Sequence, residues 1–86
     1  MSPAEVQALA EIQGYASANR RFTRHAWERM DEPGVTERDV LHALKAAASC
    51  FAQANGTWKV PSKDTSGDDL VAVVALADGV LVVTLF

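Results

Sequence analysis

His25 and Arg29 are the two residues of this chain whose types and spacing best suit chemistry on a phosphate ester. Residues four apart on one helix share a face, so both side chains can reach the same substrate. Histidine transfers protons near neutral pH, and the planar guanidinium of arginine can bind two phosphate oxygens at once. Metal-free RNA cleavage by the 2′-hydroxyl needs a base, an acid and cations that stabilise the charge on the phosphate. The pair is therefore a candidate catalytic site for such a reaction.

Five other side chains are candidates for binding the substrate: Arg21, Arg24, Lys59, Lys63 and Thr84. Arg21 and Arg24 stand at the start of the same expected helix, where free backbone amides also favour anions. Lys59 and Lys63 belong to an expected strand and the loop after it, and they can add positive charge to the site. Thr84 is a single hydroxyl on an otherwise apolar strand.

Each of these candidates also has an ordinary structural explanation. His25 can be a helix residue that bonds to the sheet or to water, and composition and spacing alone favour that explanation. The arginines can form a solvated helix start, which charge alone does not distinguish from a phosphate site. A threonine on a strand more often reflects β-propensity than contact with a substrate. The residues by themselves thus leave catalysis and plain structure as competing hypotheses.

The composition argues against several other kinds of site. The single cysteine, Cys50, cannot form a disulfide framework or a cysteine-based zinc site within one chain, and its place at the start of a strand favours a buried structural thiol. The two histidines and the scattered carboxylates lack the spacing of metal ligands, so we expect neither a metal nor another cofactor. Any catalysis must then depend on His25 and Arg29.

Length, charge and hydropathy limit the partners and the location. A chain of 86 residues forms one domain, residues 1–86. The net charge of −3 argues against general nucleic-acid binding, although residues 19–29 hold four arginines and one glutamate and can form a local basic patch. The lone cysteine and the lack of a signal-peptide pattern predict a cytoplasmic protein. The longest apolar run, Leu70–Ala77, is too short to cross a bilayer, so we expect no membrane partner.

Two helices are expected in the first third of the chain. Ser2 opens a capping box for the first helix, which should fade near Gly14–Asn19. Thr23 is the expected N-cap of a short second helix. Phe22 and Trp27 flank that cap at the spacing of a hydrophobic staple, and Trp27 is expected to face inward.

A third helix has the clearest start signal in the sequence. Glu32-Pro33-Gly34 should end the second helix, because proline cannot continue a helix and glycine tolerates the turn. Thr36 then follows as N-cap, with Asp39 at the box position three residues later.

Strands are expected in the second half of the chain. Asn55-Gly56 and Asp78-Gly79 are two-residue hairpin signals. Helices followed by hairpins predict an α+β domain, in which two to three N-terminal helices pack on an antiparallel β-meander of about four strands. The four expected strands are Cys50–Ala54, Thr57–Pro61, Asp69–Leu76 and Val80–Phe86.

The last two expected strands are apolar on both faces. Such strands are covered on both sides or meet a partner on one side, and dimerisation through them would explain the pattern equally well. Alternation along the final strand places Thr84 on the face of Val80, Val82 and Phe86.

Three blocks together resemble a family of small bacterial domains that are similar to BrnT-type and RelE-type toxins of toxin–antitoxin systems. They are Phe22-Thr-Arg-His-Ala-x-x-Arg-Met30, the Gly34-Val-Thr helix start, and Val80-Leu-Val-Val-Thr-Leu85. The resemblance covers roughly residues 20–86, a toxin-like core to which residues 1–19 add an N-terminal helix. It implies a RelE-like fold, cleavage of messenger RNA without a metal, and neutralisation by an antitoxin protein. By position it makes His25 a base or acid and Arg29 a phosphate ligand, while Lys59 transfers only by its place on a strand.

Two functions remain open for this sequence. The preferred one is a toxin-type, metal-independent endoribonuclease that acts on mRNA, as the His25–Arg29 block indicates. The alternative is a non-catalytic protein-binding module, either an inactive toxin relative or an adaptor. The acidic balance favours the alternative, and so does Pro33, which replaces the arginine usual before the turn glycine in that family. The alternative predicts that the surface around Leu81, Val83 and Phe86 is exposed in the free monomer.

Overall fold

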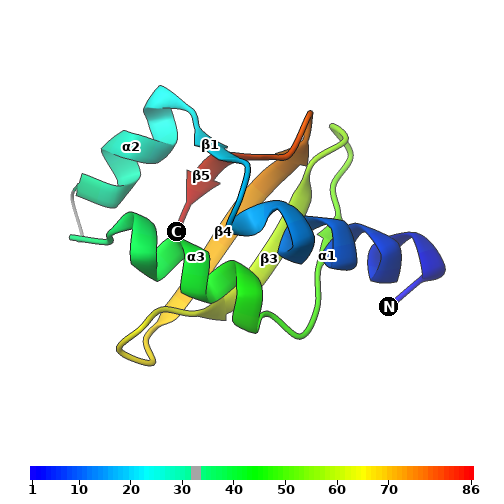
Figure 1. Cartoon of the computed structure of the whole chain (residues 1–86), viewed down its shortest axis with the longest axis horizontal. Coiled ribbons are helices and arrows are strands. Elements are labelled where there is room, and N and C mark those ends of the chain that lie inside the picture. Colours follow the sequence, from blue (N-terminus) through cyan, green and yellow to red (C-terminus); the bar gives the residue numbers. More distant parts are fainter. Residues whose placement is uncertain (32–33) are drawn as a thin grey trace.

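Helices precede most of the sheet in the computed structural model of the protein, which describes residues 1–31 and 34–86 (Figure 1). The helices are α1 (Pro3–Ala16), α2 (Arg24–Asp31) and α3 (Glu37–Ala46). The strands are β1 (Arg20–Phe22), β2 (Phe51–Ala52), β3 (Trp58–Lys63), β4 (Asp69–Leu76) and β5 (Val80–Leu85). The protein is therefore an α+β domain, as the sequence predicted.

Side-chain caps determine where the helices begin. The Ser2 hydroxyl accepts a hydrogen bond from the Glu5 amide at 3.2 Å, and the Glu5 carboxylate accepts one from the Ser2 amide at 2.9 Å. Thr36 and Asp39 repeat this capping box at the start of α3, with distances of 3.0 and 3.1 Å. Thr23 accepts a hydrogen bond from the amide three residues later in α2 at 3.1 Å. The three start signals are confirmed, because each side chain supplies a partner that the first helical turn lacks.

The short helix α2 buries only a narrow face. Ala26 and Met30 are buried against the core. The Phe22 and Trp27 rings lie 4.7 Å apart between centroids, so the predicted hydrophobic staple is present. Trp27 nevertheless remains 47% exposed, so the prediction that it faces inward was wrong. Its ring packs on Phe22 and not into the core.

The sheet contains five strands in the order β1-β5-β4-β3-β2. The strands β2 to β5 pair antiparallel in chain order, whereas β1 pairs parallel with β5 (Figure 1). The sheet is thus mixed, and the predicted antiparallel sheet of about four strands omitted β1. A strand of three residues shows too little alternation to be recognised in a sequence.

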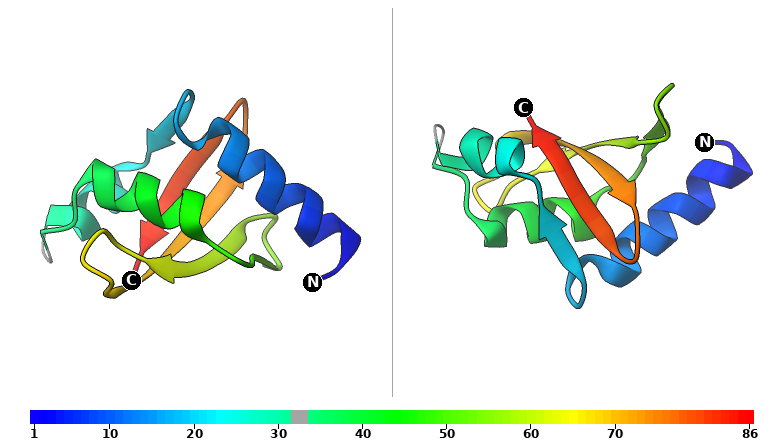
Figure 2. Two further views of the ribbon diagram at one scale, coloured as in Figure 1. Left: turned by 60° about the horizontal axis from the view of Figure 1, so that its bottom comes forward. Right: turned by 90° about the horizontal axis from the view of Figure 1, so that it is seen from above.

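The core lies between the helices and one face of the sheet. Helices α1 and α3 lie across that face, and α2 packs beside the end of β5 (Figures 1 and 2). The strands direct alternate side chains to this covered face, namely Val60, Leu70, Ala72, Val74, Val80, Val82 and Leu85. These side chains interdigitate with buried helix residues, which include Ile12, Val40 and Leu44.

A β-bulge in β5 changes which residues face the core. Val74 pairs with Val82, but its neighbour Val73 pairs with Thr84, so β5 contains one extra residue at Val83. Beyond the bulge Leu85 takes the core position and is only 2% exposed. The prediction that Thr84 shares a face with Val80 and Val82 was wrong, because strict alternation does not continue across a bulge.

The opposite side of the sheet, here termed the open face, carries none of the three helices (Figure 2). Its apolar side chains come from all of the long strands and are half-buried or exposed. The pairing registers place the following residues on it: Arg21, Phe51, Lys59, Pro61, Lys63, Asp69, Val71, Val73, Ala75, Leu81, Thr84 and Phe86, with Val83 at the bulge.

Candidate functional site

His25 is exposed in the first turn of α2. Arg29 lies one turn later on the same helix, as the spacing predicted. Within the described residues, no hydrogen bond or ion pair joins the imidazole to Arg29 or to a carboxylate that could orient it. A general base normally has such an orienting partner, so the imidazole lacks part of the machinery that proton transfer uses.

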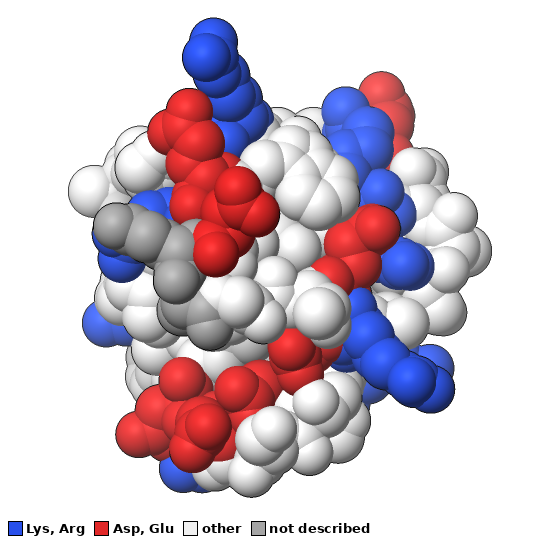
Figure 3. Space-filling model, turned by 90° about the vertical axis from the view of Figure 1, so that its left-hand side faces the viewer, with Lys and Arg blue, Asp and Glu red and all other residues white. Residues whose placement is uncertain are grey.

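The side of the molecule on which α2 lies is not a basic surface. Acidic side chains lie between the basic ones when the protein is viewed from this side (Figure 3). Arg24 pairs with Glu28 at 3.4 Å, and the two side chains are 94% and 62% exposed. An ion pair so open to water contributes little energy, but it lowers the net positive charge next to His25.

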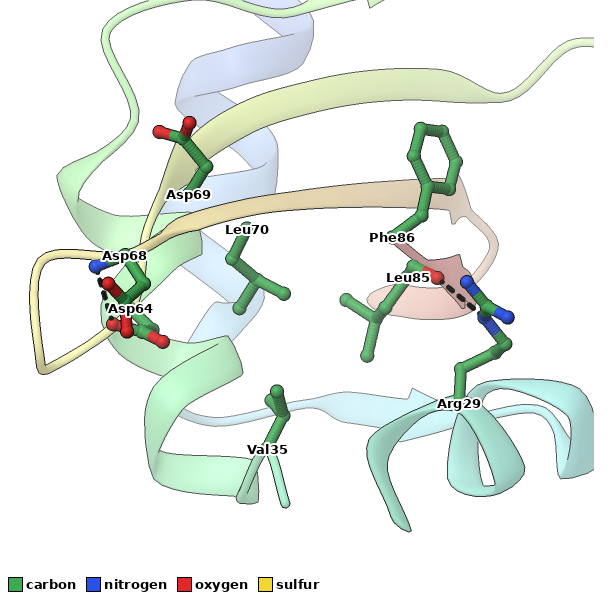
Figure 4. A pocket seen from close by; sticks show the side chains of 8 residues that line it. All are labelled: Arg29, Val35, Asp64, Asp68, Asp69, Leu70, Leu85 and Phe86. Atoms are coloured by element: carbon green, nitrogen blue, oxygen red, sulfur yellow. Dashed lines mark hydrogen bonds between the residues drawn. The ribbon is translucent and has the colours of Figure 1, made fainter. Parts of the chain in front are cut away.

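Arg29 has a structural partner at the end of the sheet. Its Nε donates a hydrogen bond to the Leu85 carbonyl at 3.0 Å (Figure 4). Thr23, which precedes α2, donates from its amide to the Val82 carbonyl at 3.0 Å and from its hydroxyl to the Val83 carbonyl at 2.6 Å. The strand β1 ends at Phe22. The Thr23 amide and hydroxyl and the Arg29 guanidinium therefore supply hydrogen-bond donors to the β5 carbonyls beyond that point. The threonine and arginine of the motif thus attach α2 to β5.

Arg21 is held at the other end of β5. It lies opposite Leu81 in the parallel pair, and its guanidinium donates to the Ala77 carbonyl in the turn between β4 and β5. Leu81 and Leu85 are four residues apart, or roughly 13 Å along a strand. Arg21 and Arg29 are therefore anchored at opposite ends of β5, and the structure does not bring them together around one phosphate.

Lys59 and Thr84 meet on the open face. They occupy one row across β3, β4 and β5, with Val73 between them. The Lys59 ammonium lies 5.8 Å from the centroid of the Phe86 ring, a cation–π contact. Of the predicted substrate-binding residues, this pair is the one that the structure places in a single row.

Lys63 also lies on the open face, but a carboxylate neutralises it. Its ammonium pairs with the Asp69 carboxylate on the neighbouring strand. The hydrogen bond between them raises the pKa of Lys63 and lowers the pKa of Asp69, because each charge stabilises the other. Lys63 is thus less able than Lys59 to attract an external anion.

A cleft of about 520 Å³ opens where β4 begins and β5 ends (Figure 4). Arg29 stands on one wall, and the carboxylates of the β3–β4 loop and the start of β4 stand across from it. Val35, Leu70 and Leu85 form the apolar floor, and the acidic wall consists of Asp64, Asp68 and Asp69. Three carboxylates repel a phosphate, so this cleft does not suit an RNA backbone.

The acidic wall is not a metal site either. Asp64 accepts hydrogen bonds from the Ser66 and Asp68 amides at 2.8 and 3.0 Å and so closes its own loop. Throughout residues 1–31 and 34–86, no three side chains of His, Cys, Asp or Glu form a group that could hold a metal ion. The aspartates of the cleft are explained by turn formation and by the pair with Lys63.

Cys50 is a structural residue. Its side chain is fully buried, and the thiol donates to the Glu5 carbonyl at 3.2 Å. Burial raises the pKa of this thiol, which keeps it protonated and unreactive. The prediction of a buried structural thiol is confirmed.

The most distinctive surface of the protein is the apolar part of the open face. Phe86 is 58% exposed, and Leu81 and Val83 of the preceding strand β5 are half-buried. Phe51, on β2 at the other edge of the sheet, is 47% exposed. The sequence pointed to the patch around Leu81, Val83 and Phe86 but missed Phe51 and the β4 residues. The sequence did contain a signal for this surface. The last two strands are apolar on both faces, and the expected helices can cover only one side of the sheet.

No helix in the described part of the chain is both long and apolar enough to cross a bilayer. Pro33, which stands where the resembled family has an arginine, lies with Glu32 outside the described residues. No family model, curated protein or solved structure matches the chain in comparisons.

Proposed function

We propose that the protein is a non-catalytic protein-binding module whose partner docks on the open face of the sheet. The observation that carries this proposal is the set of exposed and half-buried apolar side chains on that face, led by Phe51 and Phe86. Exposed apolar side chains that gather on one face of a protein can mark a binding site. A sheet with two apolar faces is stable in water when both faces are covered.

The arrangement of the charged residues supports binding over catalysis. Arg21 and Arg29 donate to carbonyls at opposite ends of β5, and Arg24 and Lys63 pair with carboxylates. A phosphoryl-transfer site needs several cations that converge on one group of oxygens. These four cations stabilise the fold or neutralise acids, whereas no helix of the described part of the chain covers the apolar open face (Figure 2).

The proposal is tested by matched substitutions on the two sides of the molecule. Val73 lies at the centre of the open face, and Val6 is an exposed valine of α1 on the other side. The partner is first captured with the tagged wild-type protein and then purified. Val73→Asp should abolish its binding, while Val6→Asp should leave the dissociation constant of the complex unchanged. Protection of β4 and β5 from hydrogen exchange in the complex would locate the contact. Equal binding by both variants would contradict the proposal.

A second candidate function is the toxin-type endoribonuclease with a RelE-like fold, cytoplasmic and neutralised by an antitoxin. One observation favours it: Lys59, Thr84 and Phe86 lie together near the end of β5 at which Arg29 is bound. A cation beside an exposed aromatic ring suits single-stranded RNA, because the ring can stack on a base.

RNA cleavage in the presence of EDTA distinguishes the two functions. A ribonuclease of this type should cleave RNA without a metal, and His25→Ala should lower the rate at least about a hundredfold, the typical contribution of a general base. His25 is exposed, so the variant should fold normally. Cleavage that survives His25→Ala would point to a contaminating nuclease and would remove this candidate.

A further inference from the structure

The open face carries positive charge on a protein that is acidic as a whole. Its charged residues on the five strands are Arg21, Lys59, Lys63 and Asp69, and Asp69 is already paired with Lys63. The complete chain has a net charge of −3. The open face therefore combines apolar side chains with a net positive charge.

Lys59 gives this charge a central position. The side chain starts on β3, and its ammonium lies 5.8 Å from the centroid of the Phe86 ring, whose backbone pairs with Val71 of β4. The two side chains together therefore span the open face of β4. Lys59 is half-buried, as expected of a lysine whose methylene groups lie along an apolar surface. A partner that covers Phe86 must also cover this ammonium. Burial of an unpaired ammonium is costly, so a fitting partner brings a carboxylate to that position.

The edge of the sheet formed by β2 and β3 is poorly suited to pairing with an added strand. The strand β2 has two residues, and its Ala52 amide already donates to the Glu5 carboxylate at 3.1 Å. Val71 exchanges both backbone hydrogen bonds with Phe86, so Pro61 on the other side of Val71 turns its backbone toward the free edge of β3. Proline has no N–H to offer there, which blocks pairing. At this edge a partner therefore meets little free backbone, whereas the open face presents exposed apolar side chains.

A second copy of the chain fits the face poorly. In a two-fold dimer through the open face, the two Lys59 ammoniums would approach each other near the axis, and no free carboxylate on the strands is available to separate them. Like charges at the centre of an interface oppose association.

Building on the proposed function, we infer that the open face binds an acidic amphipathic helix, with an apolar stripe on Val71, Val73, Leu81 and Phe86 and a carboxylate on Lys59. From Val71 to Ala75 the open face of β4 extends roughly 13 Å, which about three turns of helix cover. A helix on this face would give the sheet helices on both sides, a common three-layer arrangement. Arg21 lies beside Leu81 and can accept a second carboxylate of the partner.

Two synthetic helical peptides of about fourteen residues test the inference. Both carry the same leucine stripe, and their polar positions are glutamate in one peptide and lysine in the other. Fluorescence anisotropy should show that the glutamate peptide binds at least about tenfold more tightly, and that added salt weakens it. Lys59→Glu should reverse this preference, while Lys59→Gln should reduce it without reversal. Val6→Asp is the matched control and should bind both peptides like the wild-type protein.

The alternative outcomes separate this inference from the proposed function. If both peptides bind equally and Val73→Asp abolishes both, the open face is a docking surface but the acidic partner is wrong. If neither peptide binds, the inference fails, and the experiment with Val73→Asp and the natural partner still decides the proposed function. A dimer in sedimentation that dissociates in Val73→Asp would overturn the inference in favour of a second copy. Circular dichroism of each variant shows whether it is folded.

Discussion

Val73 and Val74 are neighbours on β4, but they lie on opposite faces of the sheet and in different surroundings. Val74 is completely buried beneath the helices, whereas Val73 remains half-buried on the open face. Both side chains are equally apolar and belong to the same regular strand. The chemistry of the two residues therefore does not determine which of them lies in the core and which on the open face. The separation depends on which face the helices cover.

Lys59 on the open face and Arg20 on the covered side have different kinds of contact. On the covered side Arg20 turns back to the Ala16 and Ser17 carbonyls at 3.2 and 3.3 Å and approaches Glu37 at 3.8 Å. On the open face the Lys59 ammonium meets only an aromatic ring among the described residues. Arg20 is thus used within the fold, as Arg21 and Lys63 are on the open face, and Lys59 differs from all three.

The same substitution at the two valines should give the largest difference. Val74→Asp would place an unpaired carboxylate in the core and should unfold the domain, a loss of about 4 kcal/mol or more. Val73→Asp should stay folded and lose less than about 1 kcal/mol, because its carboxylate can reach water. Urea unfolding followed by circular dichroism measures both changes. An unfolded Val73→Asp variant would show that the open face belongs to the stability core.

A second comparison concerns two turn glycines. Gly79 has a φ of 110°, and a Cβ built there would lie 2.4 Å from the Asn19 carbonyl oxygen. That carbonyl accepts a hydrogen bond from the Val80 amide at 2.9 Å, so it cannot move away freely. Gly56 has a φ of 81° but nothing within 4 Å of its Cβ position.

Alanine at these glycines should separate the cost of crowding from the cost of backbone strain. Gly56→Ala should lower the free energy of unfolding by about 1 kcal/mol through backbone strain alone. Gly79→Ala should lower it clearly more, on the order of 3 kcal/mol, because crowding adds to the strain. The difference between the two losses measures the energetic effect of the close contact between Asn19, just before β1, and the β4–β5 turn. Equal losses in thermal unfolding would mean that the Asn19 contact adds nothing.

A smaller effect distinguishes the two residues of the candidate catalytic pair. Arg29→Ala should lower the unfolding free energy by about 1 kcal/mol, because the Leu85 carbonyl loses its donor. His25→Ala should change stability by less than about 0.5 kcal/mol, because the exposed ring has no hydrogen-bond partner among residues 1–31 and 34–86. Chemical denaturation of both variants tests the assignment. A larger loss in His25→Ala would indicate a structural contact for the imidazole.

Signals between close neighbours in the chain predicted much of the fold. Each predicted cap joins residues three positions apart, so Ser2, Thr23 and Thr36 could be recognised without knowledge of the rest of the structure. The α+β class followed from the order of helices and hairpins. The parallel strand β1 could not be predicted, because its pairing with β5 joins residues sixty positions apart.

The candidate site was less predictable because its residues are defined by distant contacts. The bond from Arg29 to the Leu85 carbonyl spans 56 positions, and no pattern within α2 reveals it. Gln13 shows the same limit: its amide donates to the Leu44, Lys45 and Ala47 carbonyls at the end of α3, which no local pattern indicates. The bulge at Val83 reversed the predicted side of Thr84. Residue types suggested which side chains could take part in chemistry, but they did not reveal the distant groups that these side chains contact.

The smallest predicted effect compares two carboxylates, Asp39 on the covered side and Asp69 on the open face. Hydrogen bonds from Thr65 and then from Thr36 hold the pKa of Asp39 far below its ordinary value of 3.8, and the bond with Lys63 lowers the pKa of Asp69. A carboxyl with a depressed pKa in the folded protein stabilises it above the ordinary value, and this contribution is lost as the pH falls from about 5 through 3.8 and below. Asp39→Asn should therefore flatten the fall of the unfolding free energy in acid at any salt concentration, because its partners are neutral. Asp69→Asn should flatten it only at low salt, since ions screen an exposed pair. If salt changes both profiles equally, Asp39 is stabilised by charge and not by the hydroxyl and amide donors that attach the β3–β4 loop to α3.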